Sequence, residues 1–172
     1  VQQILGSLGK QVIGWDEVLH EQMPDCVVQN WRGATTRDRA LVVPRSCIVS
    51  APYYLDLHFA ADVHYQFDPQ AHQQEWLRME DALAEDRRFR HIAPALSWTH
   101  QWRAGAIELG REPGAQVLGG EACLWSELVD GSTLPMRLWS RLPAIAERLW
   151  SPADCRDVAD FYRRLMAVLG FP

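Results

Sequence analysis

The sequence predicts an α/β protein with a parallel sheet, and two features of its pattern predict this class. Short apolar runs alternate with longer helical patterns along the 172 residues, which is the order of βαβ units. The runs also end in aromatic residues beside polar groups, within residues 11–17, 26–32, 47–56 and 117–130. Parallel strands bring such ends to one rim, where barrel enzymes keep their chemistry, and four units are half of a (βα)8 barrel of the TIM type.

The composition is that of a folded domain. At 172 residues and 48% apolar content the chain is able to bury a core. No apolar run approaches the roughly 20 residues of a membrane span. The net charge of −5 favours neither nucleic acid nor an anionic membrane as a partner. Residues 1–172 show no internal repeat or linker, so we expect a single unit.

The first part of the chain is expected to contain three strands. Residues 1–9 have the pattern of the end of a helix, with Gly9 as its C-cap. Strands are expected at about 11–15, 26–30 and 47–50. Residues 34–43 have room for one helix between the second and third strands, with Thr36 or Asp38 near its start.

Residues 57–115 depart from the alternation and are expected to form a long, insert-like connection before the fourth strand. Asp68 and Pro69 predict a helix start there, and the residues up to about 88 have a helical pattern. A second helical or irregular piece is expected at 98–109.

The last part of the chain predicts one strand followed by helices. The strand is expected at 116–121, and a packed helix at 136–150, in which Pro143 should produce a kink or begin a turn. An amphipathic helix is expected at 157–169.

Neither a metal nor a cofactor is expected. The cysteines show no CxxC spacing and are expected to be free thiols rather than disulfide or zinc partners; they are Cys26, Cys47, Cys123 and Cys155. Five histidines fit no metal motif and are expected on the surface or in loops; they are His58, His64, His72, His91 and His100. The start VQQILGSLGK has no charged leader before an apolar stretch, so no signal peptide is expected within the chain, and the compartment stays open.

The segment 117–130, VLGGEACLWSELVD, ends in an indole and a carboxylate. Side chains at i and i+2 share one face of a strand, so we expect Trp125 and Glu127 to point the same way. A flat apolar wall beside hydrogen-bond acceptors is typical of carbohydrate sites. Comparable groups end the other three runs, at Trp15, Trp31, Tyr53, Tyr54 and Asp56.

Five sequence motifs together resemble those of the N-acetyl-β-hexosaminidases of glycoside hydrolase family 20. They are VIGWDEVL, VVQNWRG, IVSAPYYLDL, VLGGEACLWSELVD and RLWSRLPAIAERLWS. They occur in the order that this family uses for strands five to eight and the closing helix of its barrel. The resemblance covers most of the chain outside residues 60–115, and it implies that the chain supplies about the last four βα units of a (βα)8 barrel.

The resemblance implies an exo-acting enzyme that hydrolyses terminal N-acetylhexosamine from a glycan, with the substrate's own acetamide as nucleophile and with retention. Tyr54 would donate its hydroxyl to the acetamido oxygen, and Asp56 and Glu127 would accept hydrogen bonds from sugar hydroxyls. The walls of the pocket would be Trp15, Trp31 and Trp125. Tyr53 is expected to be structural, because it should face away from Tyr54.

One departure from the family pattern concerns the general acid. The family's adjacent Asp and Glu follow strand four in a His-Gly-Gly-Asp-Glu word, which these 172 residues do not contain, and the first-strand Arg is also missing. The chain therefore looks like the C-terminal half of the catalytic barrel, and it is expected to be inactive alone. Asp16 and Glu17 are adjacent carboxylates, but neighbours on a strand face opposite ways, so we expect them to support the site rather than catalyse.

Two functions from different classes follow from this departure. One is a glycosidase whose remaining half lies elsewhere, and the other is a noncatalytic carbohydrate-binding or assembly module. Strands five and eight would be open edges of half a barrel, so we expect the missing N-terminal half, or self-association of the isolated chain, to cover them.

Trp139 and Trp150 are expected in the core. A rim position for a second sugar and plain packing are both open for Trp76, Trp98 and Trp102.

Overall fold

The structure, a computed structural model, describes residues 1–20, 22, 25–91 and 115–170. The chain forms two compact units. Unit 1 consists of residues 1–51 and 70–121, and unit 2 consists of residues 52–69 and 122–172. The helical piece expected at 98–109, with Trp98, His100 and Trp102, lies outside the described residues.

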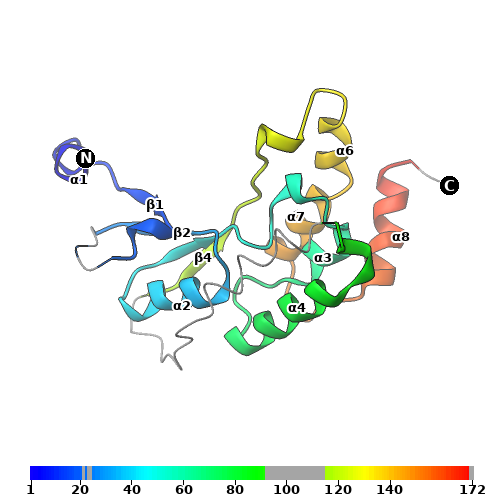
Figure 1. Cartoon of the computed structure of the whole chain (residues 1–172), viewed down its shortest axis with the longest axis horizontal. Coiled ribbons are helices and arrows are strands. Elements are labelled where there is room, and N and C mark those ends of the chain that lie inside the picture. Colours follow the sequence, from blue (N-terminus) through cyan, green and yellow to red (C-terminus); the bar gives the residue numbers. More distant parts are fainter. Residues whose placement is uncertain (21, 23–24, 92–114, 171–172) are drawn as a thin grey trace. The chain divides into compact units, whose positions relative to one another are not determined.

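Unit 1 is built on a four-stranded parallel sheet in the order β1-β2-β3-β4 (Figure 1). Its register places Trp15 opposite Gln29 and Asn30 opposite Val49. Its elements are α1 (Gln2–Ser7), β1 (Ile13–Trp15), η1 (Asp16–Val18), β2 (Val27–Asn30), α2 (Ala34–Val42), β3 (Cys47–Val49), α4 (Gln73–Glu85), η3 (Arg87–Phe89) and β4 (Val117–Gly120). The parallel sheet expected from the sequence is confirmed.

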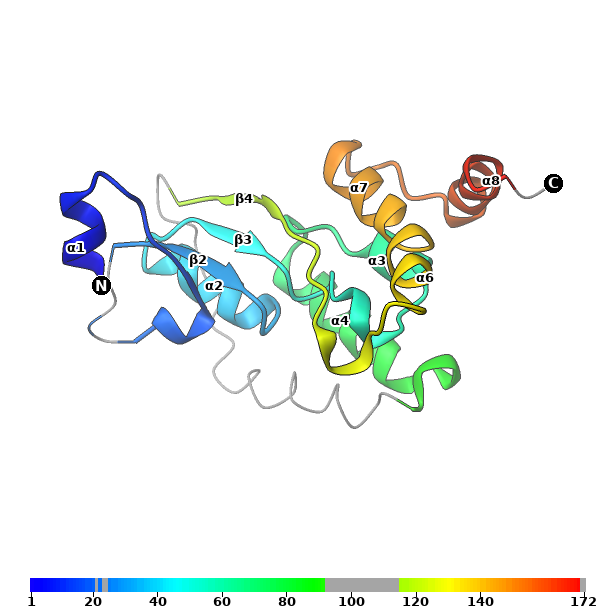
Figure 2. The same ribbon diagram turned by 90° about the horizontal axis from the view of Figure 1, so that it is seen from above.

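In unit 1, helix α2 packs on strands β2 and β3, and helix α4 packs beside α2 (Figure 2). Val28 and Val49 on the inner strands are completely buried. On the helices, the Arg37 guanidinium lies 4.8 Å from the ring centroid of Trp76, and Trp76 is also completely buried. Trp76 therefore packs in the core and is not a rim residue.

Strands β1 and β4 are the two edges of the sheet. Ile13 on β1 is 55% exposed, and Leu118 on β4 is 51% exposed. An edge strand presents unpaired N–H and C=O groups, and an apolar side chain beside them favours pairing with further protein.

Two helix ends of unit 1 test the sequence analysis. The end of α1 is as expected. Gly9 takes a φ of 65°, and the N–H of Lys10 donates to the Leu5 carbonyl at 2.9 Å. The expected start of α4 at Asp68 and Pro69 is wrong, since the helix begins at Gln73. Asp68 and Pro69 belong to unit 2, so the chain enters the helix only after it has crossed into unit 1.

Unit 2 is a cluster of helices and short turns. Its elements are η2 (Leu55–Leu57), α3 (Ala61–Gln66), η4 (Ser126–Leu128), α6 (Leu134–Trp139), α7 (Leu142–Trp150) and α8 (Val158–Val168). The Tyr65 ring of α3 stacks on Phe161 of α8 with centroids 4.5 Å apart, and Ala144 of α7 joins the same apolar cluster. The Asp157 carboxylate caps α8 by accepting from the Asp160 N–H at 3.0 Å. The helix expected at 157–169 is therefore confirmed.

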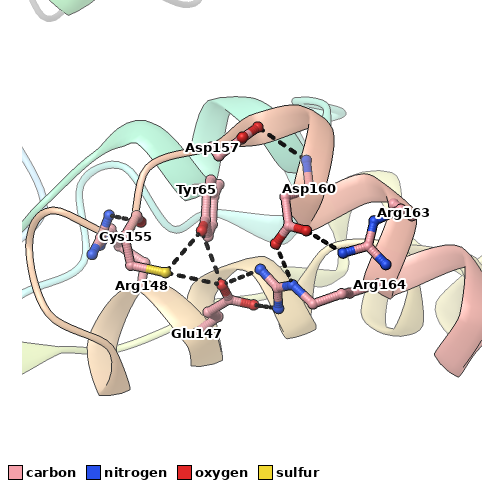
Figure 3. Close-up of polar contacts among 8 residues, drawn as sticks. All are labelled: Tyr65, Glu147, Arg148, Cys155, Asp157, Asp160, Arg163 and Arg164. Carbon is pink, nitrogen blue, oxygen red and sulfur yellow. Dashed lines mark hydrogen bonds and ion pairs between the residues drawn. The ribbon is translucent and has the colours of Figure 1, made fainter.

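A polar network joins α3, α7 and α8 beside this cluster (Figure 3). Glu147 Oε1 accepts from the Tyr65 hydroxyl at 2.9 Å, and both Glu147 oxygens pair with the Arg164 guanidinium at 2.6 Å. Arg164 also donates to Asp160 at 2.7 Å. The hydrogen bonds from Arg164 hold the pKa of Glu147 below its usual range, so the carboxylate stays ionised.

Helices α6 and α7 correct the expectation for two tryptophans. Pro143 lies in the first turn of α7, so its expected role in starting a turn is confirmed. Trp139 and Trp150, however, are 61% and 92% exposed rather than core residues. Each follows a buried arginine, Arg137 or Arg148, by two residues, which places it about 200° further round the helix and away from the buried face.

The cysteines and the helices of the described residues bear on two further properties of the chain. All four cysteines carry free thiols. Among the helices of the described ranges, none has the length and apolar character needed to cross a membrane.

The expected surface or loop position of His64 is also wrong, because this residue of α3 is completely buried. Its Nδ1 lies 2.7 Å from the Pro52 carbonyl, an acceptor, so Nδ1 carries a proton and donates it. Desolvation is the largest cause that lowers the pKa of His64 to about 4. The buried ring is therefore neutral near pH 7, with its proton on Nδ1.

We predict that acid weakens unit 2 through His64. The unfolded chain binds the proton near pH 6.5, while the folded chain resists it down to pH 4, so stability is full above 6.5 and falls as the pH drops. The loss due to this ring is about 2 kcal/mol at pH 5 and roughly 3 kcal/mol at pH 4. Urea unfolding at several pH values, compared between the wild type and His64→Asn, measures it. An equal pH dependence in both proteins contradicts the prediction.

Candidate functional site

Two candidate residues of unit 1 lie where neighbouring strands end. Trp15 is the last residue of β1, and Trp31 follows β2 directly. The two strands pair in parallel, so their carboxyl ends lie at the same edge of the sheet. Both tryptophans are partly buried.

Asp16 lies between these two tryptophans in the chain and is only 2% exposed. Its Oδ2 accepts from the backbone N–H groups of Trp31 and Arg32 at 2.9 and 2.8 Å. The Asn30 amide and the Thr36 hydroxyl also donate to this carboxylate. Burial raises the pKa of Asp16, while these hydrogen bonds lower it. Asp16 is therefore a structural anchor, in keeping with the supporting role expected from the sequence.

Tyr54 in unit 2 lies beside Cys123, in a short parallel bridge. The N–H of Leu55 donates to the Cys123 carbonyl at 2.8 Å, and the N–H of Cys123 donates to the Tyr53 carbonyl at 3.1 Å. The Tyr53 side chain is completely buried, and its hydroxyl donates to the Phe67 carbonyl at 2.8 Å. The expected structural role of Tyr53 is confirmed.

Asp56, Trp125 and Glu127 lie close together in unit 2. Asp56 Oδ1 accepts from the backbone N–H of Trp125 at 3.2 Å. Burial is the largest cause that raises the pKa of Asp56, and the negative charge of Glu127 raises it further. Trp125 is 46% exposed. The group thus combines an open indole with two carboxylates.

The expectation that Trp125 and Glu127 share one face of a strand is wrong, although the two residues do lie near each other. The ladder with β3 ends at Gly120, and Glu127 belongs to the short helix η4. The chain leaves the sheet after Glu121 and enters unit 2. Their proximity therefore comes from a tight turn and not from the two-residue period of a strand.

Comparison with known proteins decides the family. The catalytic-domain profile described as glycosyl hydrolase family 20 matches residues 1–153, a stretch that includes all six candidate residues. The chain belongs to glycosyl hydrolase family 20.

Curated relatives of this family 20 chain are much longer proteins. The β-hexosaminidase subunit beta of Rattus norvegicus is 32% identical over 173 aligned residues, covering 96% of this chain and 26% of that protein. The β-hexosaminidase of Porphyromonas gingivalis is 31% identical, covering 95% of this chain and 19% of that protein. The chain spans about a quarter or less of the length of these two relatives.

Solved structures show the same fold. The chitobiase of Flavobacterium johnsoniae is 27% identical with a TM-score of 0.68, over 97% of this chain and 22% of that one. A family 20 β-N-acetylhexosaminidase from Streptomyces coelicolor, at 23% identity and a TM-score of 0.64, covers all of this chain and 34% of its own. The four parallel strands of this family 20 chain therefore form part of a TIM-barrel fold, the fold class that the sequence resemblance implied.

The structure gathers the candidates within each unit. Trp15 and Trp31 belong to unit 1, and the other four belong to unit 2, namely Tyr54, Asp56, Trp125 and Glu127. Among the described residues, no group of three or more His, Cys, Asp or Glu side chains is arranged to hold a metal ion.

The sequence analysis of this family 20 chain missed Arg137. This side chain of α6 is 2% exposed, and it donates to the carbonyls of Asp56 at 2.8 Å and Leu128 at 3.1 Å. It thus joins η2, which carries Asp56, to η4, which carries Glu127. The signal was present as a spacing, because Arg137 and Arg141 are four residues apart within a largely apolar helical word.

We predict that Arg137→Met destabilises the chain by roughly 2–4 kcal/mol, because methionine fills similar space but leaves two buried carbonyls without donors. Arg137→Lys should lose less. Arg163→Met, at an exposed position of α8, is the matched control and should change little. Circular dichroism during urea unfolding measures the loss. Equal stability of Arg137→Met and the control contradicts the role given to Arg137.

Proposed function

We propose that this chain is the sugar-pocket part of a β-N-acetylhexosaminidase that removes terminal N-acetylhexosamine residues from glycans. The observation that carries the proposal is the family 20 match, which spans every candidate residue. The relatives named β-hexosaminidase support the reaction class. A family 20 exo-β-N-acetylglucosaminidase from Vibrio harveyi, described in complex with N-acetylglucosamine, supports the substrate class.

Each candidate residue has a physical role in this proposal. The indoles of Trp15, Trp31 and Trp125 stack on the apolar face of a pyranose. Asp56 and Glu127 accept hydrogen bonds from sugar hydroxyls. A buried carboxylate such as Asp56 gains more from a donating hydroxyl than an exposed one does, so a substrate that lacks the hydroxyl is rejected.

Tyr54 assists the reaction directly in this proposal. Its hydroxyl donates to the acetamido oxygen of the substrate and holds the acetamide under the anomeric carbon. The acetamide then acts as the nucleophile, which is the exception to the usual two-carboxylate scheme of retaining glycosidases. Orientation of this kind supplies much of the rate, because the reacting groups are already in contact.

The general acid and its partner Asp come from outside these residues in our proposal. The 172 residues contain no His-Gly-Gly-Asp-Glu word. Asp16 and Glu17 are poor substitutes, since Asp16 is 2% exposed and already accepts bonds from two backbone N–H groups. A chain that binds the sugar but does not cleave it also fits a noncatalytic binding module.

We predict binding without turnover for the 172-residue chain. Ligand-detected NMR should show binding of N-acetylglucosamine but not of glucose, because glucose has no acetamide for Tyr54. Tyr54→Phe and Trp125→Ala should each weaken binding at least about tenfold, or 1.4 kcal/mol. No hydrolysis of an aryl N-acetylglucosaminide is expected.

The control for this experiment is Trp139→Phe, which changes an exposed indole of α6 outside the candidate group. Equal affinity for glucose, or an equal loss in the control, contradicts the proposed pocket. Turnover that disappears in Glu17→Gln contradicts the proposed source of the acid. Addition of the remaining part of a family 20 barrel separates the two functions, since an enzyme then gains turnover and a binding module does not.

We also propose that the edges of the sheet are covered by further protein. The covering protein is the other half of the barrel, or a second copy when this chain is studied alone. Ile13 on β1 and Leu118 on β4, each about half exposed, support this proposal. Parallel strands close into a barrel only when both edges find partners.

We predict that the isolated chain associates in a concentration-dependent way. Light scattering after size exclusion should give a mass at least twice that of the monomer. Ile13→Lys should lower the association, because a charge on an edge strand opposes pairing. The control is Leu8→Lys, at an exposed apolar residue outside the strands. A compact, monodisperse monomer in the wild type contradicts the proposal.

A further inference from the structure

Two adjacent carboxylates, Asp16 and Glu17, contact the same dipeptide, Trp31–Arg32. Asp16 holds the backbone of this dipeptide, through both of its N–H groups at 2.9 and 2.8 Å. The two residues open the short helix η1, directly after β1. They reach the dipeptide from a neighbouring strand end, because β1 and β2 pair in parallel.

Glu17 holds the side chains of the same dipeptide. Its Oε2 accepts from the indole Nε1–H of Trp31 at 3.2 Å, and its Oε1 pairs with Arg32 Nη2 at 2.7 Å. The Arg32 guanidinium carbon in turn lies 5.1 Å from the ring centroid of Trp31, within cation–π range. The carboxylate and the guanidinium therefore restrain both the edge and the face of the indole.

Several hydrogen bonds hold the anchor beneath this contact. The Asn30 amide donates to Asp16, to the Thr36 hydroxyl at 2.8 Å and to the Gly33 carbonyl at 3.0 Å. Gly33 has a φ of 106°, a backbone conformation that residues with a side chain rarely adopt, so the loop depends on glycine at this position. All of these residues belong to unit 1.

We infer that Asp16 and Glu17 are positioning residues for Trp31, in which Asp16 sets the backbone and Glu17 sets the plane of the indole. Neither is a catalytic residue. The inference rests on the proposed role of Trp31 as a wall of the sugar pocket. A ring that is already oriented binds a pyranose without losing side-chain freedom at that moment, which strengthens binding.

The test observes the indole N–H of Trp31 directly. The chain is labelled with ¹⁵N in its tryptophan indoles, and Trp31→Phe identifies the resonance. In Glu17→Ala the N–H of Trp31 should exchange with water at least about threefold faster, since its acceptor is gone. Glu17→Gln keeps an acceptor oxygen but not the ion pair with Arg32, so its effect should be intermediate.

Two further variants separate positioning from folding. Glu85→Ala removes an exposed carboxylate at the end of α4 and should leave the Trp31 resonance unchanged. Asp16→Asn keeps one acceptor oxygen for the two backbone N–H groups, and it should shift the Trp31 signal while far-ultraviolet circular dichroism stays that of the wild type. A Trp31 resonance and exchange rate that are the same in Glu17→Ala and the wild type overturn the inference.

A second measurement separates this inference from the proposed function. The affinity for N-acetylglucosamine is measured for each variant. If Trp31 is a pocket wall, the affinity of Glu17→Ala should be at least about threefold lower than that of the wild type. Faster exchange with unchanged affinity supports the positioning of the indole and overturns the place of Trp31 in the pocket. Absence of sugar binding in the wild type overturns the proposed function, and the exchange rates still decide the role of Glu17.

Discussion

Parallel pairing of four strands in chain order is the constraint on which the rest of the structure depends. This pairing brings the carboxyl ends of all four strands of unit 1 to one edge of the sheet. The segments that link each strand to the next helix are short. The helix η1 begins directly after Trp15, and α2 begins four residues after Asn30. Segments of this length cannot bury an apolar core of their own, so polar anchors hold them in place.

The anchors are buried charged groups that bond to the backbone. In unit 1 the Asp16 carboxylate accepts from two N–H groups. In unit 2 the guanidinium of Arg137 donates to two carbonyls, and so does that of Arg148. A buried charge costs free energy unless its hydrogen bonds are made. Such bonds demand one loop conformation, which makes these groups effective at fixing the residues next to them.

The two units differ in what they present. Unit 1 offers the two indoles at the ends of β1 and β2, and Glu17 and Arg32 restrain one of them. Unit 2 offers hydrogen-bonding groups around one open indole, with Asp56 linked to the backbone of Trp125. An apolar wall and a set of acceptors are the two parts of a sugar site. The family 20 match spans the candidate residues of both units.

Much of this protein was determined by its sequence alone. The apolar runs predicted four parallel strands, the helix ending at Gly9 and the amphipathic helix α8 followed from local signals, and five words identified the family. Such features depend on neighbours in the chain, whose periodicity and capping act over a few residues. Tertiary structure decided which side chains are covered. Trp139 and Trp150 are exposed, His64 is buried, and Asp16 and Arg137 became anchors. Burial depends on the element that packs against a residue, and that element is distant in the sequence.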